Sequence, residues 1–248
     1  MYGDFARVYD RLMRDVDYGA WGAHYRKLLE QAGVPRGGRV LEGACGTGNM
    51  TMELAGHYSV TPGDASEEML SVAARKARQA GLSLAFTRQD LRALAAHRPA
   101  DAVVCACDGV NYLLTPRDLR RFLLSAYRAL KPGGALAFDL SSHFKLSRLL
   151  PKAPQVLLEE DIAYVWLSRW DQRAQRLHME LSVFARRTDG AFDRLVERQA
   201  QRGWSRGEIE AALRQAGFGS VRCYGNLTLR APGPQARRLH FLAKKPLE

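Results

Sequence analysis

The clearest chemical signal in the chain is a turn of small residues that directly follows an apolar run. Gly46 and Gly48 lie in this turn, and because glycine has no Cβ, a ligand can approach the backbone closely there. Such a turn, at the carboxyl end of a strand beside the topological switch point, is the expected ligand site of an open α/β sheet. The complete segment reads Val40-Leu41-Glu42-Gly43-Ala44-Cys45-Gly46-Thr47-Gly48-Asn49.

Two acids farther along the chain indicate which ligand the turn binds. The segment does not complete the dinucleotide fingerprint G-x-G-x-x-G, because Thr51 stands where the third glycine would be. The absence of Gly-Lys-Ser/Thr here also excludes a P-loop. Asp64 lies 16 residues after Gly48, at the end of the next predicted strand, where its carboxylate can accept hydrogen bonds from both ribose hydroxyls. Asp90 follows the third predicted strand and can accept from an exocyclic adenine amine. The pattern predicts a nucleoside ligand without a pyrophosphate.

Alternating strands and helices must hold these residues in place. Short apolar runs alternate with helical spacing up to residue 140, which is typical of βαβ units and a parallel sheet. Ser66 and Thr115 are expected N-caps, and Lys131-Pro132-Gly133-Gly134 is an expected helix stop. The predicted strands are 39–44, 58–61, 84–87, 101–106 and 135–140, and the predicted helices are 18–32, 50–56, 66–80 and 116–130.

The pattern changes after residue 140. Residues 156–170, 177–187 and 192–200 lack helical spacing and hold β-branched or aromatic residues in polar surroundings, which predicts antiparallel strands. Ser205-Arg206-Gly207-Glu208 then forms a capping-box pattern for a helix to Ala216. Two further predicted strands, 219–224 and 238–243, return the chain to the first sheet.

Composition narrows the class of protein. A chain of 248 residues, 46% hydrophobic and 25% charged, is globular rather than disordered or collagen-like, and it is long enough for one large domain. No apolar run is long enough to span a membrane, and the acidic start gives no leader signal, so we expect a cytoplasmic protein without membrane contact. The cysteines, without a Cys-x-x-Cys pair, are expected to be reduced thiols.

Charge and histidine distribution bear on partners and metals. Residues 169–248 carry 16 Lys and Arg against 8 Asp and Glu, so most of the formal net charge of +11 lies in the last third. This basic part is either a solvated surface or a nucleic-acid contact. The scattered residues His24, His57, His97, His178 and His240 form no pair with metal-ligand spacing, and we expect no metal.

The glycine-rich turn resembles the first motif of class I S-adenosylmethionine-dependent methyltransferases, and the resemblance covers nearly the whole chain. The N-terminus Met1-Tyr2-Gly3-Asp4-Phe5-Ala6-Arg7-Val8-Tyr9-Asp10 is similar to the Met-Tyr-x-x-Phe-Ala-x-x-Tyr-Asp pattern of a group of bacterial methyltransferases. The stretches 64–70 and 108–113 are also similar to that group, and aminosugar N-methyltransferases share a related layout. The chain departs from the family at Pro62, which removes a backbone donor from an interior strand, at Ala44 and at Glu42.

This resemblance implies an α/β fold: a Rossmann-like, mainly parallel seven-stranded sheet with helices on both faces, an N-terminal helical lid and a small antiparallel β insertion. We expect one domain over 1–248, with the lid at 1–35, the cofactor-binding core at 36–145, the insertion on the acceptor side at 156–202, and a return to the core sheet at 203–246.

The resemblance also implies S-adenosylmethionine as methyl donor and S-adenosylhomocysteine as product. Asp64 would hold the ribose hydroxyls, and Asp90 with Leu91 would meet the polar edge of adenine. The remaining implied contacts are Gly43, Ala44, Cys45, Gly46 and Gly48 along the methionine and ribose, Ala65 and Met69 beside adenine, Cys107 and Asp108 under the methionyl end, and Tyr9, Trp21 and Tyr25 as a lid.

Methyl transfer from a sulfonium needs alignment and a dry pocket more than a fixed catalytic group. His143 is a candidate base for an acceptor hydroxyl or amine, or else a structural histidine. Tyr112 and Asn111 are candidates for orienting the acceptor by hydrogen bonding, although Tyr112 could instead be a packing residue. Asp139 is expected to cap a turn. We expect a small-molecule acceptor with an N or O nucleophile and a monomer or homodimer. The alternatives are an RNA or protein methyltransferase that uses the basic last third, and a non-catalytic S-adenosylmethionine-binding protein.

Overall fold

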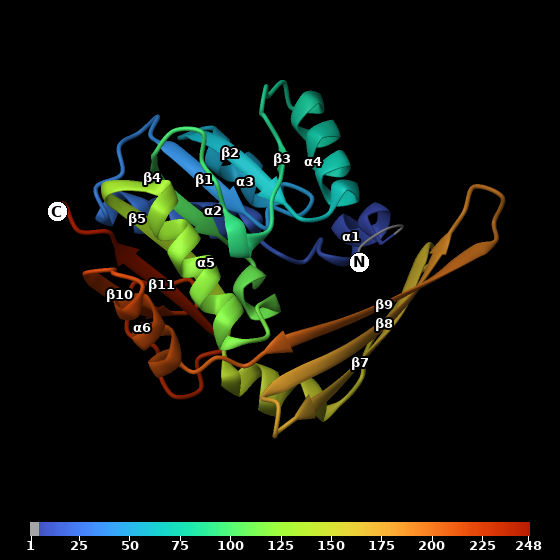
Figure 1. Ribbon diagram of the computed structural model, residues 1–248. Helices are drawn as coiled ribbons and strands as arrows, with labels where there is room; N and C mark the ends of the chain where they lie inside the picture. The colour runs from blue at the N-terminus through green and yellow to red at the C-terminus, as the bar shows by residue number, and fades with distance from the viewer. Residues whose placement is uncertain (1–4) are drawn as a thin grey trace.

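The computed structural model describes residues 5–248 and contains two β-sheets (Figure 1). The larger sheet has seven strands in the order β10-β11-β5-β4-β1-β2-β3. Strand β11 is antiparallel to both of its neighbours, and the other pairings are parallel. This confirms the predicted mainly parallel, seven-stranded Rossmann-like sheet. Its strands are β1 (Arg39–Gly43), β2 (Ser59–Asp64), β3 (Thr87–Arg88), β4 (Ala100–Cys105), β5 (Leu130–Ser141), β10 (Ser220–Gly225) and β11 (Arg238–Lys244).

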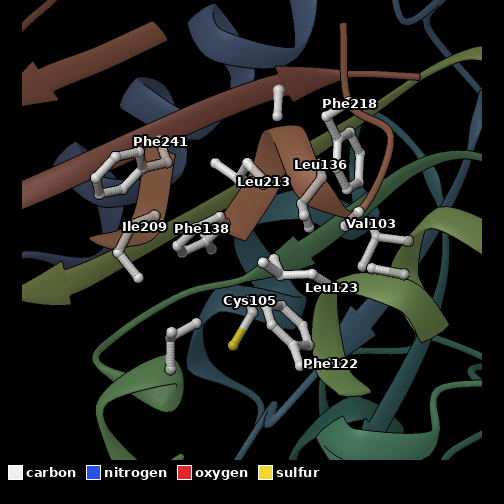
Figure 2. Close-up of a cluster of buried hydrophobic side chains, with 14 of the residues drawn as sticks. Val103, Cys105, Phe122, Leu123, Leu136, Phe138, Ile209, Leu213, Phe218 and Phe241 are labelled. Atoms are coloured by element: carbon white, nitrogen blue, oxygen red, sulfur yellow. The ribbon is translucent and has the colours of Figure 1, made fainter. Parts of the chain in front are cut away.

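Helices cover both faces of this sheet because its central strands are apolar on both sides. Along β4, Val103 and Cys105 face one core cluster and Ala102 and Val104 face the other, as the two-residue repeat of a strand requires. The first cluster includes side chains of α5 (Pro116–Ala129) and α6 (Arg206–Gln215), and Figure 2 shows it. The second includes side chains of α2 (Tyr18–Gln31) and α3 (Asn49–Ala55).

The smaller sheet is antiparallel, in the order β6-β7-β8-β9, and its long strands extend away from the main body (Figure 1). One of its faces packs against α1 (Ala6–Leu12) and α4 (Glu67–Gln79) through a cluster that includes Val8, Met69 and Val183. The N-terminal helix α1 therefore lies between the two sheets. The strands are β6 (Gln155–Leu158), β7 (Ile162–Asp171), β8 (Arg176–Arg186) and β9 (Phe192–Arg202).

Two local predictions differ from the structure. The run 156–170, expected as one strand, is two strands, because the chain turns where the backbone N–H of Glu159 donates to the carbonyl of Ile162. The expected strand 84–87 is reduced to β3. The helix stop expected at 131–134 is confirmed, because α5 ends at Ala129 and β5 begins directly after it.

Strand β2 continues through Pro62, which is paired with Glu42 of β1. The pairing of β2 with β3 begins only at Gly63. The hydrogen bonds between these two strands therefore do not require the backbone N–H that Pro62 lacks. Within residues 5–248, no helix is long and apolar enough to cross a membrane.

Candidate functional site

The glycine-rich turn connects β1 to α3 at the carboxyl edge of the parallel strands. Ala44, Gly46 and Gly48 have φ values of 55°, 54° and 80°, in the left-handed region. A Cβ at Gly46 would meet nothing within 4 Å, so the backbone there borders open space, whereas a Cβ at Gly43 would lie 2.6 Å from Leu91 Cδ2. Gly46 thus borders open space beside the turn, and Gly43 is needed for close packing behind it.

Asp64 ends the neighbouring strand β2 and is tied to the same turn. Its Oδ2 accepts from the backbone N–H of Gly46 at 2.8 Å and its Oδ1 from that of Ser66 at 2.9 Å. Burial raises the pKa of Asp64, and the backbone N–H donors oppose this effect by favouring the carboxylate. Each carboxylate oxygen retains acceptor capacity for a ligand hydroxyl.

A cavity of about 640 Å³ opens beside this turn, within the range of small-molecule sites. It brings together ten of the predicted site residues: Tyr9, Ala44, Gly46, Asp64, Ala65, Met69, Asp90, Leu91, Cys107 and Tyr112. A smaller cavity of about 50 Å³ shares Tyr9, Ala44, Gly46 and Cys107 with it and adds Cys45. The two hollows therefore adjoin along the glycine-rich turn.

The segment after β4 is held in an unusual backbone conformation. Cys107 and Asp108 have φ values of 56° and 70°, which are costly for residues other than glycine and cluster at ligand sites. Their backbone N–H groups both donate to Asp139, at 2.7 Å to Oδ1 and 3.3 Å to Oδ2. Asp139 thus fixes this segment, a role beyond the turn cap that the sequence suggested.

Asp139 belongs to a buried ionic network with Arg238. The Nη1 of Arg238 bonds to both Asp108 and Asp139, and the Tyr25 hydroxyl donates to Asp139 at 2.8 Å. Burial raises the pKa of Asp139 despite the guanidinium. Burial also acts to raise the pKa of Asp108, but the positive charges of Arg238 and Lys145 outweigh it, so that this pKa is lowered.

The helix α1 is tied to the turn by a residue that sequence reasoning missed. Asp10 Oδ1 accepts from Thr47 Oγ1 at 2.6 Å and from Asn49 Nδ2 at 3.0 Å, and Oδ2 accepts from Lys76 Nζ of α4 at 2.8 Å. Burial acts to raise the pKa of Asp10, but the bonds from Lys76 and Thr47 lower it overall. Asp10 ends the N-terminal pattern that resembles a group of bacterial methyltransferases, and this pattern was the available signal. We call these four residues, Asp10, Thr47, Asn49 and Lys76, the α1 latch.

Tyr18 is a second residue that the sequence analysis missed. It opens helix α2 and lines the smaller cavity together with Tyr9 and Glu42. Burial raises the pKa of Tyr18 to about 12. Burial is also the main reason that the pKa of Glu42 is raised to about 7. Thr51 Oγ1 donates to Glu42 Oε2 at 2.6 Å.

Several predicted site residues do not line either cavity. Trp21 and Tyr25 pack in the core below the turn, with ring centroids 5.5 Å and 5.9 Å from that of His240. Gly43, Gly48 and Asp108 support the turn and the segment after β4 from behind.

Asp90 does line the larger cavity, but Arg92 already donates to its carboxylate through the backbone N–H at 2.8 Å and Nε at 2.9 Å.

The three catalytic candidates have different surroundings. Asn111 is fully buried, and its amide bonds to the backbone of Ser141 and of Arg202. His143 Nε2 lies 2.7 Å from Gln175 Oε1, and its ring is edge-on to Trp170, outside both sets of lining residues. Tyr112 lines the larger cavity and donates to Gln199 Oε1 of β9 at 2.7 Å. Within residues 5–248, no group of three His, Cys, Asp or Glu side chains could hold a metal ion.

Comparison with known proteins agrees with this geometry. A family model described as a methyltransferase domain matches residues 40–134. The relative named Putative methyltransferase YqeM, from Bacillus subtilis (strain 168), is 37% identical over 247 residues, covering 99% of this chain and 97% of the relative. A crystal structure of an S-adenosylmethionine-dependent methyltransferase from Clostridium acetobutylicum is 28% identical with a TM-score of 0.89, covering 99% of each chain.

The fold extends to more distant structures. The sugar N-methyltransferase KedS8 from Streptoalloteichus is 24% identical with a TM-score of 0.76, covering 96% of this chain and 93% of that one. Together with the glycine-rich turn, the acid that ends β2 and the full-length relatives, these matches confirm the resemblance seen in the sequence: the chain belongs to the S-adenosylmethionine-dependent methyltransferases.

Proposed function

We propose that this enzyme transfers the methyl group of S-adenosylmethionine to a nitrogen or oxygen nucleophile of a small molecule enclosed between α1, the glycine-rich turn and the segment after β4. The observation that carries the proposal is the cavity of about 640 Å³, which runs from Asp64 and Asp90 to Cys107 and Tyr112. A volume of this size holds a nucleoside-containing cofactor and leaves limited room for a compact acceptor.

The lining residues fit the parts of the cofactor in order. Asp64 would accept the ribose hydroxyls, since its two oxygens are aimed by the N–H groups of Gly46 and Ser66. Ala65 and Met69, at the start of α4, would flank adenine, and Asp90 with Leu91 would meet its polar edge. The remaining contacts in this proposal are Gly46, Ala44 and Cys45 along the methionine part and Tyr9 above it.

Bound S-adenosylmethionine supplies an activated methyl group on a sulfonium, ready for in-line displacement. The chain then has to bind, orient and keep water out. Tyr9 on α1 would close the site over the turn, and Cys107, fixed by Asp139, would form its floor. Tyr112, oriented by Gln199, is the polar lining group best placed to hydrogen-bond an acceptor.

Proton removal does not require His143 in this scheme. Its ring is held by Gln175 and Trp170 outside the lining residues, which favours the structural reading of this histidine. An amine that enters in its neutral form needs no protein base before it attacks, and the proton it carries after transfer can pass to solvent. The sugar N-methyltransferase that shares the fold supports an amine-bearing small molecule as the first class to test.

The alternative acceptors are RNA and protein, and the basic last third of the chain is the observation behind them. Many of its arginines are already paired with acids on the same surface, among them Arg186, Arg187, Arg198 and Arg206. Such pairing reduces the net positive field that nucleic-acid binding requires. We therefore place macromolecular acceptors second.

The test combines binding with turnover. Calorimetric titration with S-adenosylmethionine and S-adenosylhomocysteine, after mass spectrometry to check for co-purified cofactor, measures the cofactor site directly. Release of S-adenosylhomocysteine is then measured in mixtures of small amines, small hydroxylated compounds, RNA and protein. We expect turnover only with the small molecules; turnover only with RNA or protein would refute the small-molecule assignment. Binding without turnover in any mixture would favour a non-catalytic binding protein.

A further inference from the structure

The outward side of helix α5 carries a row of arginines. Their positions in the sequence are those that a helix of 3.6 residues per turn brings to one side. The four side chains, all exposed, are Arg117, Arg120, Arg121 and Arg128. Figure 1 shows α5 on the outside of the large sheet, and its opposite side packs in the core through residues that include Phe122 and Leu123. We call these four arginines the α5 arginine row.

The acids nearest to the α5 arginine row are engaged elsewhere. Asp118 is the one acid in the sequence of α5, and its carboxylate accepts from Thr115 Oγ1 at 2.6 Å and lies 3.7 Å from Arg92 Nη1. On the neighbouring helix α6, Glu210 pairs with Arg206 and Arg214. Within residues 5–248, none of the four arginines of the row forms an ion pair. The row is therefore a set of positive charges that the described chain does not neutralise.

The charges of the row act against the stability of their own helix. Arg117 lies in the first turn of α5, and Arg120 and Arg121 follow directly, at the end where the helix dipole is positive. Arg117 is also three and four residues from Arg120 and Arg121, and like charges at these spacings repel on a helix. Helix α5 is stabilised instead by the cap at Thr115 and by burial of its inner side. An anionic partner outside the chain would remove both unfavourable effects.

The row begins beside the larger cavity. Asp118 and Arg92 both line that cavity. The hydrogen bond from Arg92 is the main reason that the pKa of Asp90 is lowered, and the charge of Arg121 contributes to the same shift. From Arg117 the row runs along α5 to Arg128, over about 16 Å at 1.5 Å per residue. None of its four arginines lines either cavity.

The spacing of the row indicates what kind of anion it fits. A single phosphate group would need guanidinium groups that converge on one point, whereas these are spread along three turns of helix. A protein interface is centred on apolar and aromatic side chains, and the apolar side chain within the row, Leu124, is half-buried. Spread guanidinium groups without an apolar centre suit the phosphate backbone of a nucleic acid, because arginine binds phosphate oxygens in bidentate fashion.

The exposure of α5 on one side only favours RNA over DNA. A helix that reads DNA enters the major groove, but α5 is held against the sheet by its buried side. Base-paired RNA has a wide, shallow minor groove and is recognised mostly through its phosphates and 2′-hydroxyls. One exposed side of a helix can contact such a surface without entering a groove.

We propose that the α5 arginine row is a docking surface for the phosphate backbone of base-paired RNA, next to the cofactor cavity. This proposal goes beyond methyl transfer and does not depend on which molecule accepts the methyl group. An enzyme that does not bind RNA would leave the small-molecule assignment intact. Methylation of RNA without any turnover of small molecules would refute that assignment and leave the docking surface standing.

Fluorescence anisotropy with a labelled RNA hairpin, whose stem has about 16 base pairs, tests the proposal on the full chain. In Arg117→Gln/Arg120→Gln, we expect RNA affinity to fall by on the order of 10- to 100-fold at about 50 mM salt. The plot of log affinity against log salt concentration should also become less steep by about 2. Removal of two phosphate contacts explains both changes.

The matched control is Arg75→Gln/Arg78→Gln on α4. These two arginines are also exposed, also three residues apart on a helix and also without an ion pair within residues 5–248. The control variant loses the same charge, and its RNA affinity should stay within about twofold of wild type. Circular dichroism and S-adenosylhomocysteine titration check the fold and the cofactor site of each variant, since neither pair of arginines lines a cavity.

Thermal melting gives an independent readout. Because the charges of the row oppose the helix dipole, Arg117→Gln/Arg120→Gln should melt at or above the wild-type temperature. A lower melting temperature would mean that these arginines stabilise α5, which contradicts the reasoning. The proposal is also overturned if the wild type at about 10 µM fails to bind the RNA hairpin in about 50 mM salt, or if both double variants lose RNA affinity equally. A DNA hairpin of the same sequence that binds as tightly, or capture by phosphatidylserine vesicles in place of RNA, overturns the assignment to RNA.

Discussion

Removal of the Asp10 carboxylate should open the site without unfolding the enzyme. In Asp10→Ala, helix α1 loses its bonds to Thr47 at 2.6 Å, Asn49 at 3.0 Å and Lys76 at 2.8 Å. Side chains of Asp10 and Lys76 are 37% and 26% exposed, so the ion pair between them is screened in part. With ~0.5–1.5 kcal/mol for each hydrogen bond and little added for the exposed charge, the latch stabilises the closed position by about 2 kcal/mol.

A change of about 2 kcal/mol corresponds to roughly 30-fold in the balance between closed and open α1. Since Tyr9 lies on the same helix and lines both cavities, we expect Asp10→Ala to weaken S-adenosylhomocysteine binding by about 10- to 30-fold, mainly through faster dissociation. Calorimetry gives the affinity, and stopped-flow fluorescence gives the dissociation rate. Asp15→Ala, at an exposed position in the same segment, is the matched control and should behave as wild type. Unchanged affinity and dissociation rate in Asp10→Ala would refute the latch.

Three other substitutions test the site and its support. Asp64→Ala should weaken S-adenosylmethionine binding by on the order of 1–3 kcal/mol in calorimetry, because a ribose-binding carboxylate is lost. Thr51→Val leaves the buried Glu42 carboxyl without its donor at 2.6 Å and should lower the melting temperature by roughly 2–10 °C. Burial lowers the pKa of His240 well below its ordinary value and that of His24 to about 4. Below about pH 6.5 the unfolded chain therefore binds more protons than the folded one, and stability falls as the pH drops. In His240→Leu, the decrease in melting temperature from about pH 7.5 to about pH 5.5 should be smaller than in wild type.

For each of these three predictions, one outcome would contradict the reasoning. Asp64→Ala with wild-type affinity would remove this residue from the cofactor site. A Thr51→Val enzyme that melts at the wild-type temperature would mean that Glu42 finds another donor. His97→Leu, at an exposed position, is the control for the pH series, and a wild-type slope in His240→Leu would exclude the buried pair as its source.

Much of the fold was predictable from local pattern. The alternation of apolar runs with helical spacing, the caps at Ser66 and Thr115 and the small-residue turn are properties of short segments. The carboxyl ends of parallel strands meet at one edge of a sheet, so residues that directly follow a strand, such as Asp64 and Asp90, come together once the sheet is predicted. Both line the same cavity in the structure.

The tertiary structure decided which partners these residues find. Tyr25, expected in the lid, and Asn111, expected to orient the acceptor, are both fully buried, because Asp139 and the backbone of Ser141 and Arg202 accept hydrogen bonds from their polar groups. The division of 156–170 into two strands depends on a hairpin turn in which β6 pairs back onto β7, and residue type alone did not mark this turn.

By itself, then, the sequence determined where a nucleoside could meet the backbone, since that follows from glycine spacing and from acids at strand ends. Only the tertiary structure decided that Asp10 ties α1 to the turn and that Val156 and Leu158 of β6 stay exposed. The physical reason is that a hydrogen bond or an apolar contact between residues far apart in the chain depends on distance in the folded molecule. Side-chain type and local spacing set which contacts are possible, and packing selects among them.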